Sequence, residues 1–330
     1  MLRASVYGNT DPGLIRSNNE DAYIAQSIWD NNHWLLVVID GLGGYEGGEV
    51  AASIAKTTIL GAMEKYQDRD CLDAIMQSIA DANNAIFYQR KSSDNLSDMA
   101  CVITAAVLDL SKKQLNVAHV GDTRLYLCDN NGLLKLTHDH SFVGGLEDDG
   151  HITEEDAMKH PRRNLIDRIV GDELKEKETP RFIEAAVFPV TKGNQYLLCS
   201  DGLSDMLTSA DILSVMQKHI SAKRKVNQLI SSANKRGGKD NVTAIVVFVN
   251  SEQDNTNIGL RNGLTQGKKQ KIKKIKKKKD IRNDNSIYQD DVQNVEHDKG
   301  IGRYLWKVFF MLTLLLIIVF LFYLLIYTNL

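Results

Sequence analysis

Short apolar runs bounded by polar turns recur through residues 1–250 and predict β-strands. These runs are residues 34–39, 102–108, 114–119, 124–128, 195–199 and 242–249. Apolar residues at helical spacing lie between them, at residues 48–66, 71–90 and 210–218. Two strand pairs are separated only by short turns, at residues 109–113 and 129–132, so each pair is expected to be antiparallel. The pattern therefore predicts a layered α+β domain over residues 1–250, with helices outside antiparallel strands.

The pattern changes after residue 250. Residues 251–303 are polar, contain few large apolar side chains, and are predicted to form a disordered linker. A basic run, KKQKIKKIKKKK, occupies residues 268–279. This run has three interpretations: a solvated spacer, a localisation signal, or a patch that binds anionic lipid. Its position close to an apolar segment favours the lipid interpretation.

That apolar segment, residues 304–327, is predicted to be a transmembrane helix. Residues 308–327 contain no charged side chain, and a helix of this length is about 30 Å long, which is the thickness of a bilayer core. Tyr304 and Trp306 at one end, and Tyr323 and Tyr327 at the other, are typical of interfacial aromatic belts. A buried core helix is the alternative, but the segment has no polar face. Only the short tail 328–330 follows, so we expect a single-pass, C-terminal tail anchor.

The charge distribution separates the body of the chain from its tail. Residues 251–330 contain 14 Lys/Arg and 8 Asp/Glu, which leaves 26 basic and 34 acidic residues in 1–250. The excess of Lys and Arg before residue 304 places the body on the cytosolic side of the membrane. An acidic body argues against binding of nucleic acid and is compatible with a site that holds cations.

The four cysteines are not spaced as metal-binding or disulfide motifs are. The chain has no CxxC pair and no Cys/His array. We therefore expect neither a zinc site nor a disulfide framework, and we expect reduced thiols in the core.

Acidic residues lie at the ends of the predicted strands, each beside glycine or another small turn residue. Asp40 ends LLVVID before Gly41, and the other four are Asp21, Asp122, Asp201 and Asp240. Carboxylates gathered at one sheet edge repel one another unless cations neutralise them. Oxygen ligands without clustered His or Cys indicate Mg²⁺ or Mn²⁺.

The glycine cluster after Asp40 does not fit a nucleotide-binding loop. The segment DGLGGYEGGEV has Glu46 where a dinucleotide fingerprint needs its third glycine, and it contains no GK[ST]. The acids Glu46 and Glu49 would also repel a pyrophosphate. We expect these glycines to form a tight loop into the helix at residues 48–66, with Glu49 in the first turn of that helix.

Six motifs in order make the chain resemble the metal-dependent serine/threonine phosphatases of the PP2C (PPM) type, in their bacterial form. The motifs are GLIRSNNED (13–21), DGLGG (40–44) with Gly48-Glu49 beyond, VGDTR (120–124), LTHDHS (136–141), SDGLSD (200–205) and GKDNVT (238–243). The resemblance implies a four-layer α-β-β-α sandwich of two antiparallel sheets flanked by helices. It also implies a flap over residues 140–172.

The resemblance further implies hydrolysis of phosphoserine and phosphothreonine in proteins by a dinuclear Mg²⁺ or Mn²⁺ site that activates a bridging water. Asp40, Asp201, Asp240 and the carbonyl of Gly41 match the ligands of two ions, and Asp122 matches a ligand of a third, weaker ion. Glu20 and Asp21 match residues that ligate or orient water. Arg16 matches a phosphate-binding residue, a role for which its forked guanidinium is suited. The partners implied are phosphorylated proteins and a cognate Ser/Thr kinase.

One departure concerns the leaving group. Animal members of the family carry a proposed general acid, histidine, two residues after the bridging aspartate, and this chain has Leu42 there. The alternative to an active phosphatase is a catalytically weak module that binds a phosphoprotein or a kinase at a membrane.

Overall fold

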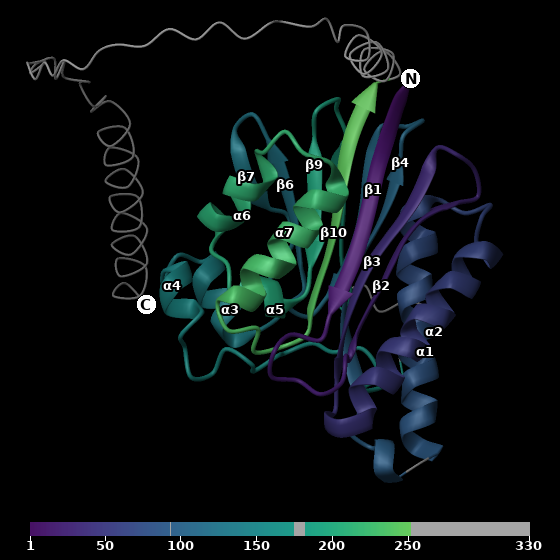
Figure 1. Cartoon of the computed structure of the whole chain (residues 1–330). Coiled ribbons are helices and arrows are strands. Elements are labelled where there is room, and N and C mark those ends of the chain that lie inside the picture. The colour runs from purple at the N-terminus through teal and green to yellow at the C-terminus, as the bar shows by residue number, and fades with distance from the viewer. Residues whose placement is uncertain (93, 175–181, 252–330) are drawn as a thin grey trace, which may run out of the picture. The chain divides into compact units, whose positions relative to one another are not determined.

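The fold consists of two five-stranded antiparallel sheets, seen in a computed structural model that describes residues 1–92, 94–174 and 182–251 (Figure 1). The strands of the first sheet, in spatial order, are β1 (Leu2–Asp11), β10 (Val242–Ser251), β9 (Gln195–Cys199), β6 (Arg124–Asp129) and β7 (Gly132–Lys135). Those of the second are β2 (Asp21–Ile28), β3 (His33–Leu42), β4 (Ala100–Asp109), β5 (Gln114–Val120) and β8 (Glu184–Pro189).

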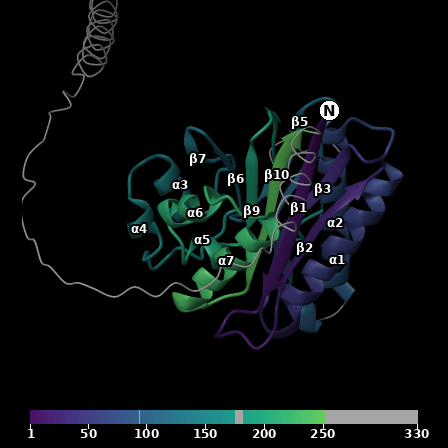
Figure 2. The ribbon, with the colours of Figure 1, turned by 45° about the horizontal axis from the view of Figure 1, so that its top comes forward.

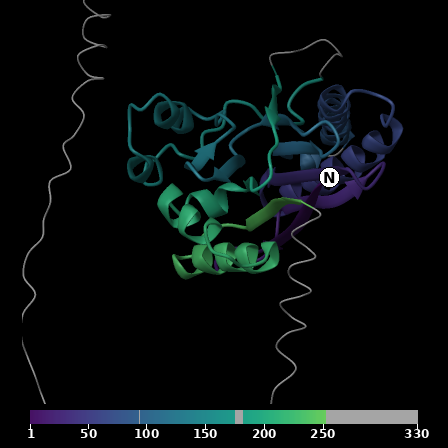
Figure 3. The same cartoon turned by 90° about the horizontal axis from the view of Figure 1, so that it is seen from above.

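Helices cover the outer faces of the two sheets (Figure 3). The helices α1 (Gly44–Lys65) and α2 (Cys71–Ser92) pack on the second sheet. The helices α6 (Ser209–Met216) and α7 (Ala222–Lys235) pack on the first. A third core cluster lies between the sheets. The α+β sandwich of two antiparallel sheets flanked by helices is therefore confirmed.

Strand β3 shows how the layers follow from the sequence. Leu35, Val37 and Ile39 belong to the core beneath α1 and α2. Leu36 and Val38 belong to the core between the sheets. Because successive side chains of a strand point to opposite faces, a strand buried on both faces reads as an unbroken apolar run. The run LLVVI thus fixes β3 in the middle of the sandwich.

The remaining elements are short. They are the 3₁₀ helix η1 (Asp94–Leu96) and the helices α3 (Phe142–Asp148), α4 (Glu154–Ala157) and α5 (Asp201–Ser204). Figure 2 shows α3 and α4 beside α5 and α6, away from α1 and α2. Hydrogen bonds join α4 to α6: the backbone N–H and the hydroxyl of Ser209, at the start of α6, both donate to Glu154 Oε1, at the start of α4, each over 2.8 Å.

Two local predictions are confirmed and one is wrong. The turn-connected pairs β4–β5 and β6–β7 are antiparallel. The helix predicted to start at Gly48 starts at Gly44, so Gly48 lies inside α1 and Glu49 lies beyond its first turn. The glycine loop is thus shorter than expected. Gly48 serves close packing and not a turn, because a Cβ on this residue would lie 2.5 Å from Glu20 Oε2.

Within residues 1–92, 94–174 and 182–251, no helix is both long and apolar enough to cross a bilayer. The predicted linker from residue 252 onward, its basic run at 268–279 and the predicted span at 304–327 all lie outside the described residues.

Candidate metal centre

Four of the predicted site residues lie at one edge of the second sheet, the edge at which β2 begins and β3 ends. Asp21 at the start of β2 lies directly opposite Asp40 near the end of β3. The backbone N–H of Gly41 donates to the carbonyl of Glu20 over 3.1 Å. The pairing register, which the apolar faces of both strands fix, therefore brings Glu20, Asp21, Asp40 and Gly41 together.

The first sheet meets this edge through Asp21. Ser200 Oγ and Thr243 Oγ1 both donate to Asp21 Oδ2, over 2.7 and 2.6 Å. Ser200 immediately precedes Asp201, and Thr243 follows Asp240 by three residues. Asp21 thus links the two sheets and brings Asp201 and Asp240 to the same edge as Asp40.

Asn241 holds the loop that carries Arg16, and sequence reasoning assigned it no role. Its Nδ2 donates to the carbonyls of Pro12 and Asn18, over 3.0 and 2.9 Å. Its Oδ1 accepts the backbone N–H of Glu20 over 2.7 Å. The motif GKDNVT contained this residue, but a sequence does not reveal that a side chain bridges to a segment more than 200 positions away.

The carboxylates of the centre repel one another. Burial raises the pKa of Asp40 well above its usual range, and the charges of Asp21, Asp201, Asp122 and Asp240 raise it further. Burial also raises the pKa of Asp201 well above its usual range, and the charges of its acidic neighbours, first among them Asp205, raise it further. Such a set of oxygen donors fits hard divalent cations, which would neutralise the repulsion. The residues present therefore fit Mg²⁺ or Mn²⁺.

Backbone segments approach so closely here that only glycine fits. A Cβ on Gly41 would lie 2.2 Å from the carbonyl oxygen of Gly48. A Cβ on Gly202 would lie 2.0 Å from that of Asn241. Backbone carbonyls cannot rotate away as a side chain can, so both contacts forbid a larger residue.

We expect Gly202→Ala to lower the free energy of unfolding by about 1–3 kcal/mol, the usual cost of overpacking. The matched control is Gly61→Ala in α1, where an added Cβ would meet no heavy atom within 4 Å. That change should instead stabilise the chain by about 0.5–1 kcal/mol, because alanine favours the helix. Urea denaturation of both variants measures whether each substitution lowers or raises the free energy of unfolding. Equal effects of both substitutions would contradict the steric explanation.

Arg16 stands beside the carboxylates but is paired with one of them. Its Nη2 donates to Asp240 Oδ2 over 2.8 Å, and both side chains are more than a third exposed. The residue predicted to bind phosphate, Arg16, is therefore in direct contact with Asp240, a residue predicted to bind a cation.

Asp122 extends the centre towards a pocket that sequence reasoning did not anticipate. Burial and the charges of Asp139 and Asp205 raise the pKa of Asp122 to about 7. Asp122, Asp201 and Asp205 line one pocket together with Arg163, whose Nε donates to Asp205 Oδ2 over 2.9 Å. Asp205 follows Asp201 by four residues, so the helical spacing of SDGLSD could have identified it.

A sequence profile of the family described as "Protein phosphatase 2C" matches residues 16–245. The chain belongs to this family. It is 34% identical over 255 residues to "Serine/threonine phosphatase stp" of Listeria welshimeri, covering 74% of this chain and 95% of that protein. It is 35% identical over 241 residues to "Serine/threonine protein phosphatase PstP" of Mycobacterium tuberculosis, covering 73% of this chain and 44% of that protein.

Solved structures agree with this assignment. The crystal structure of the phosphatase PstP/Ppp from Mycobacterium tuberculosis superposes with a TM-score of 0.65 at 32% identity, covering 75% of this chain and 99% of that one. The catalytic domain of PstP in complex with two manganese ions gives 0.65 at 30% identity, covering 76% and 100%. The prediction of a metal-dependent protein phosphatase is confirmed at the level of the family.

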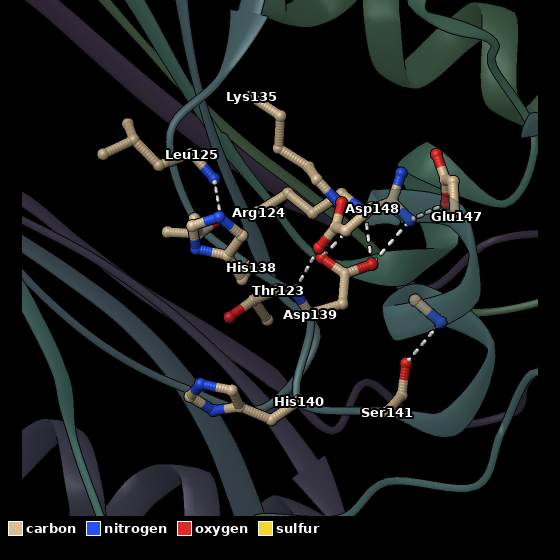
Figure 4. Close-up of polar contacts among 12 residues, drawn as sticks. Thr123, Arg124, Leu125, Lys135, His138, Asp139, His140, Ser141, Glu147 and Asp148 are labelled. Atoms are coloured by element: carbon tan, nitrogen blue, oxygen red, sulfur yellow. Dashed lines mark hydrogen bonds and ion pairs between the residues drawn. The ribbon is translucent and has the colours of Figure 1, made fainter. Parts of the chain in front are cut away.

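In this protein phosphatase 2C domain, the segment after Asp122 is held by a network of charges around the buried Asp139 (Figure 4). Arg124 Nη2 pairs with Asp139 Oδ2 over 2.6 Å and with Glu147 Oε2 over 2.9 Å. Lys135 Nζ pairs with Asp148 Oδ1 over 2.6 Å. The network ties β6 and β7 to α3, the first helix of the predicted flap.

The crowded carboxylates predict an unusual pH dependence for the domain without divalent cations. Burial and acidic neighbours raise the pKa of Asp122 to about 7 and the pKa values of Asp40 and Asp201 well above their usual range, whereas aspartates in an unfolded chain have a pKa near 4. The folded state then binds more protons than the unfolded state, so stability is lost as the pH rises through this window. In EDTA, the thermal midpoint should therefore rise when the pH falls from about 8.5 to about 7.

Saturating Mn²⁺ should remove or reverse this slope, since the cation then replaces the protons. The window lies above the usual pKa of histidine, about 6.5, so that histidines contribute little to it. A thermal midpoint in EDTA that falls when the pH is lowered from about 8.5 to about 7 would contradict the assignment of a crowded acidic centre.

Proposed function

We propose that the chain hydrolyses phosphoserine and phosphothreonine in proteins at the edge defined by Asp21 and Asp40. Asp40, Asp201, Asp240 and the carbonyl of Gly41 would hold two Mn²⁺ or Mg²⁺ ions, and Asp122 would help to hold a third. The convergence of these acids from separate segments of the chain carries the proposal, because the raised pKa values of Asp40 and Asp201 mark a site that needs positive charge. The two manganese ions of the similar PstP domain support the same ligand chemistry.

When bound, divalent cations offset the charge of a phosphate ester and make water a stronger nucleophile. The chain's own residues would provide the rest. Arg16 would exchange its contact with Asp240 for the phosphate oxygens of the substrate, since its side chain is exposed enough to move. Asp21, fixed by Ser200 and Thr243, and Glu20, fixed through Asn241, would orient water at the reacting phosphorus.

The leaving serine or threonine oxygen needs a proton, and Leu42 cannot donate one. We infer that solvent donates this proton. The proposed reaction therefore needs no histidine at this position.

The decisive experiment measures hydrolysis of a phosphothreonine peptide by the full chain in EDTA and after addition of Mn²⁺. We expect activity only with the cation, and loss of that activity in Asp201→Asn. Cation-independent hydrolysis would overturn the proposal. Tight binding of the phosphopeptide without turnover would instead favour a phosphoprotein-binding module.

We further propose that residues 304–327 anchor the domain as a C-terminal, single-pass span with the domain in the cytosol. Residues 268–279 would then lie close to anionic lipid, and phosphoproteins or a cognate kinase at the same membrane would be the partners. The uncharged run at 308–327 supports this proposal. Deletion of residues 304–330 should move the protein from the membrane fraction to the supernatant, and an unchanged distribution would refute the anchor.

A further inference from the structure

A second group of potential ligands lies at the opposite end of the sandwich from the acidic centre. His33, Cys71 and Asp109 each present one ligand atom, and these atoms lie within 4.8 Å of one another. His33 and Asp109 are cross-strand partners at the ends of β3 and β4, and Cys71 begins α2. His33 is seven residues before Asp40 on β3, about 23 Å away at about 3.3 Å per residue.

The carboxylate of Asp109 is incompletely satisfied. The residue is fully buried, and its Oδ1 accepts hydrogen bonds from Ser111 and Lys112. Its Oδ2 has no hydrogen-bond partner in the described part of the chain. His33 Nε2 lies 3.4 Å from this oxygen without satisfying hydrogen-bond geometry. An unsatisfied buried carboxylate oxygen is costly, which indicates that another group belongs there.

The imidazole of His33 is oriented as a metal ligand would be. Its Nδ1 lies 2.7 Å from Asp30 Oδ1, where only an N–H on Nδ1 can make a hydrogen bond. The neutral ring then carries its lone pair on Nε2, which faces Asp109 and Cys71. A carboxylate that fixes the tautomer from the far side of the ring is typical of histidines that bind zinc.

Thiolate, imidazole and carboxylate together form a ligand set for Zn²⁺. One Cys⁻ and one Asp⁻ would neutralise the cation, so that the buried site would carry no net charge. Burial raises the pKa of the Cys71 thiol to about 11, and a cation would take the place of that proton, which passes to solvent. His33 is 17% exposed, which leaves an approach for the ion and for a solvent molecule as fourth ligand.

A second cluster in the domain lacks these properties. His119, His140 and Glu184 also present ligand atoms within 4.8 Å of one another. However, His119 Nε2 faces the carbonyl of His138 over 3.1 Å and must carry hydrogen. His140 Nδ1 accepts the Gly121 N–H over 3.1 Å, and its Nε2 lies 3.4 Å from Glu184 Oε2. The ring nitrogens of both histidines are therefore engaged by neighbouring groups, and this cluster is a hydrogen-bond network.

We propose that His33, Cys71 and Asp109 bind one Zn²⁺ ion, which cross-links the start of α2 to the ends of β3 and β4. The site uses none of the residues of the acidic centre. Its ligands come from three separate segments, which is why the spacing of the cysteines did not indicate it. The expectation that the chain has no zinc site rested on that spacing alone.

Cobalt replaces zinc and reports its ligands, since a thiolate bound to Co²⁺ gives a near-ultraviolet charge-transfer band that oxygen ligands do not give. The full chain is first saturated with Mg²⁺ to fill the oxygen-donor centre, and one equivalent of Co²⁺ is then added. We expect the thiolate band to appear and to disappear when Zn²⁺ displaces the cobalt. Cys71→Ser should abolish the band, and Asp109→Asn and His33→Gln should weaken Co²⁺ binding at least about tenfold.

Cys128→Ser is the matched control, because Cys128 is also free and buried but lies outside the cluster, and it should leave the band unchanged. Zn²⁺ should also raise the thermal midpoint of the unsubstituted chain and not that of Cys71→Ser. No band, or a band that persists in Cys71→Ser, would overturn the proposal. So would NMR titration showing His33 fully protonated at neutral pH in the presence of Zn²⁺, because an imidazolium between Asp30 and Asp109 would then occupy the space.

Discussion

Asp40→Asn is expected to lower kcat/KM for a phosphothreonine peptide by at least about 10²- to 10³-fold, the usual cost of one lost charge-stabilising group in an active site. Asn keeps the shape of the side chain but removes the charge that would help to hold divalent cations. Steady-state kinetics at saturating Mn²⁺ measures the loss. Asp68→Asn is the matched control, because Asp68 is an exposed acid outside the centre, and it should retain full activity.

The same substitution should make the metal-free chain more stable. Asp40 is repelled by four neighbouring aspartates, which together with burial raise its pKa well above the usual range. Asn relieves this repulsion, so the thermal midpoint in EDTA at pH 8 should rise. Loss of activity together with a gain in stability separates a functional role from simple misfolding. A variant that loses both would show that Asp40 supports the fold and would refute this account of the centre.

The strand ends of the acidic centre could be predicted because each carries a strong local signal. An apolar run, an acid and a glycine follow one another at Asp40 and again at Asp201. The middle of strand β3, residues 35–39, is buried on both faces and is therefore apolar, and the acid at residue 40 marks where the chain leaves the core. The repeated signal identified residues that the structure brings to one edge.

Strands and helices that are only partly buried were harder to predict. Strand β1 (Leu2–Asp11) is partly exposed along most of its length, and its polar residues hid the strand pattern. Helix α7 was also missed, although Val226, Leu229, Ile230 and Ala233 have the i, i+3, i+4, i+7 spacing of a buried helix face. The signal for this helix was therefore present in the sequence, but the basic residues at the start of the helix obscured it.

Individual side-chain contacts between distant segments could not be predicted. Asn241 bonds to Pro12 and Asn18, and Cys71 meets His33 and Asp109, because the sheets and helices fold these segments together. No local pattern encodes such a meeting. The motifs therefore indicated which residues lie in the acidic centre, and the strand register showed how they converge.

Arg124→Met is expected to destabilise the domain by about 3–5 kcal/mol, the largest stability effect that we predict. Methionine is apolar and of similar length, so the change removes the charge with little loss of packing. It leaves Asp139, whose side chain is only 3% exposed, and Glu147 without their main partner. Lys135 Nζ, 3.3 Å from Asp139 Oδ1, compensates only in part. Urea denaturation measures the loss.

Arg236→Met provides the control, because its pair with Asp211 is equally short, at 2.6 Å, but both side chains are about a third or more exposed. Exposed pairs contribute about 0–1 kcal/mol, so burial and not distance should decide the difference between the two variants. Although burial alone would raise the pKa of Asp139, Arg124 and Lys135 hold it below its usual value. In Arg124→Met that pKa should rise, and protonation of Asp139 would remove the unpaired charge. The stability deficit should therefore shrink as the pH falls towards 4, whereas a deficit that is independent of pH would indicate lost packing around Arg124 instead of an unpaired buried charge.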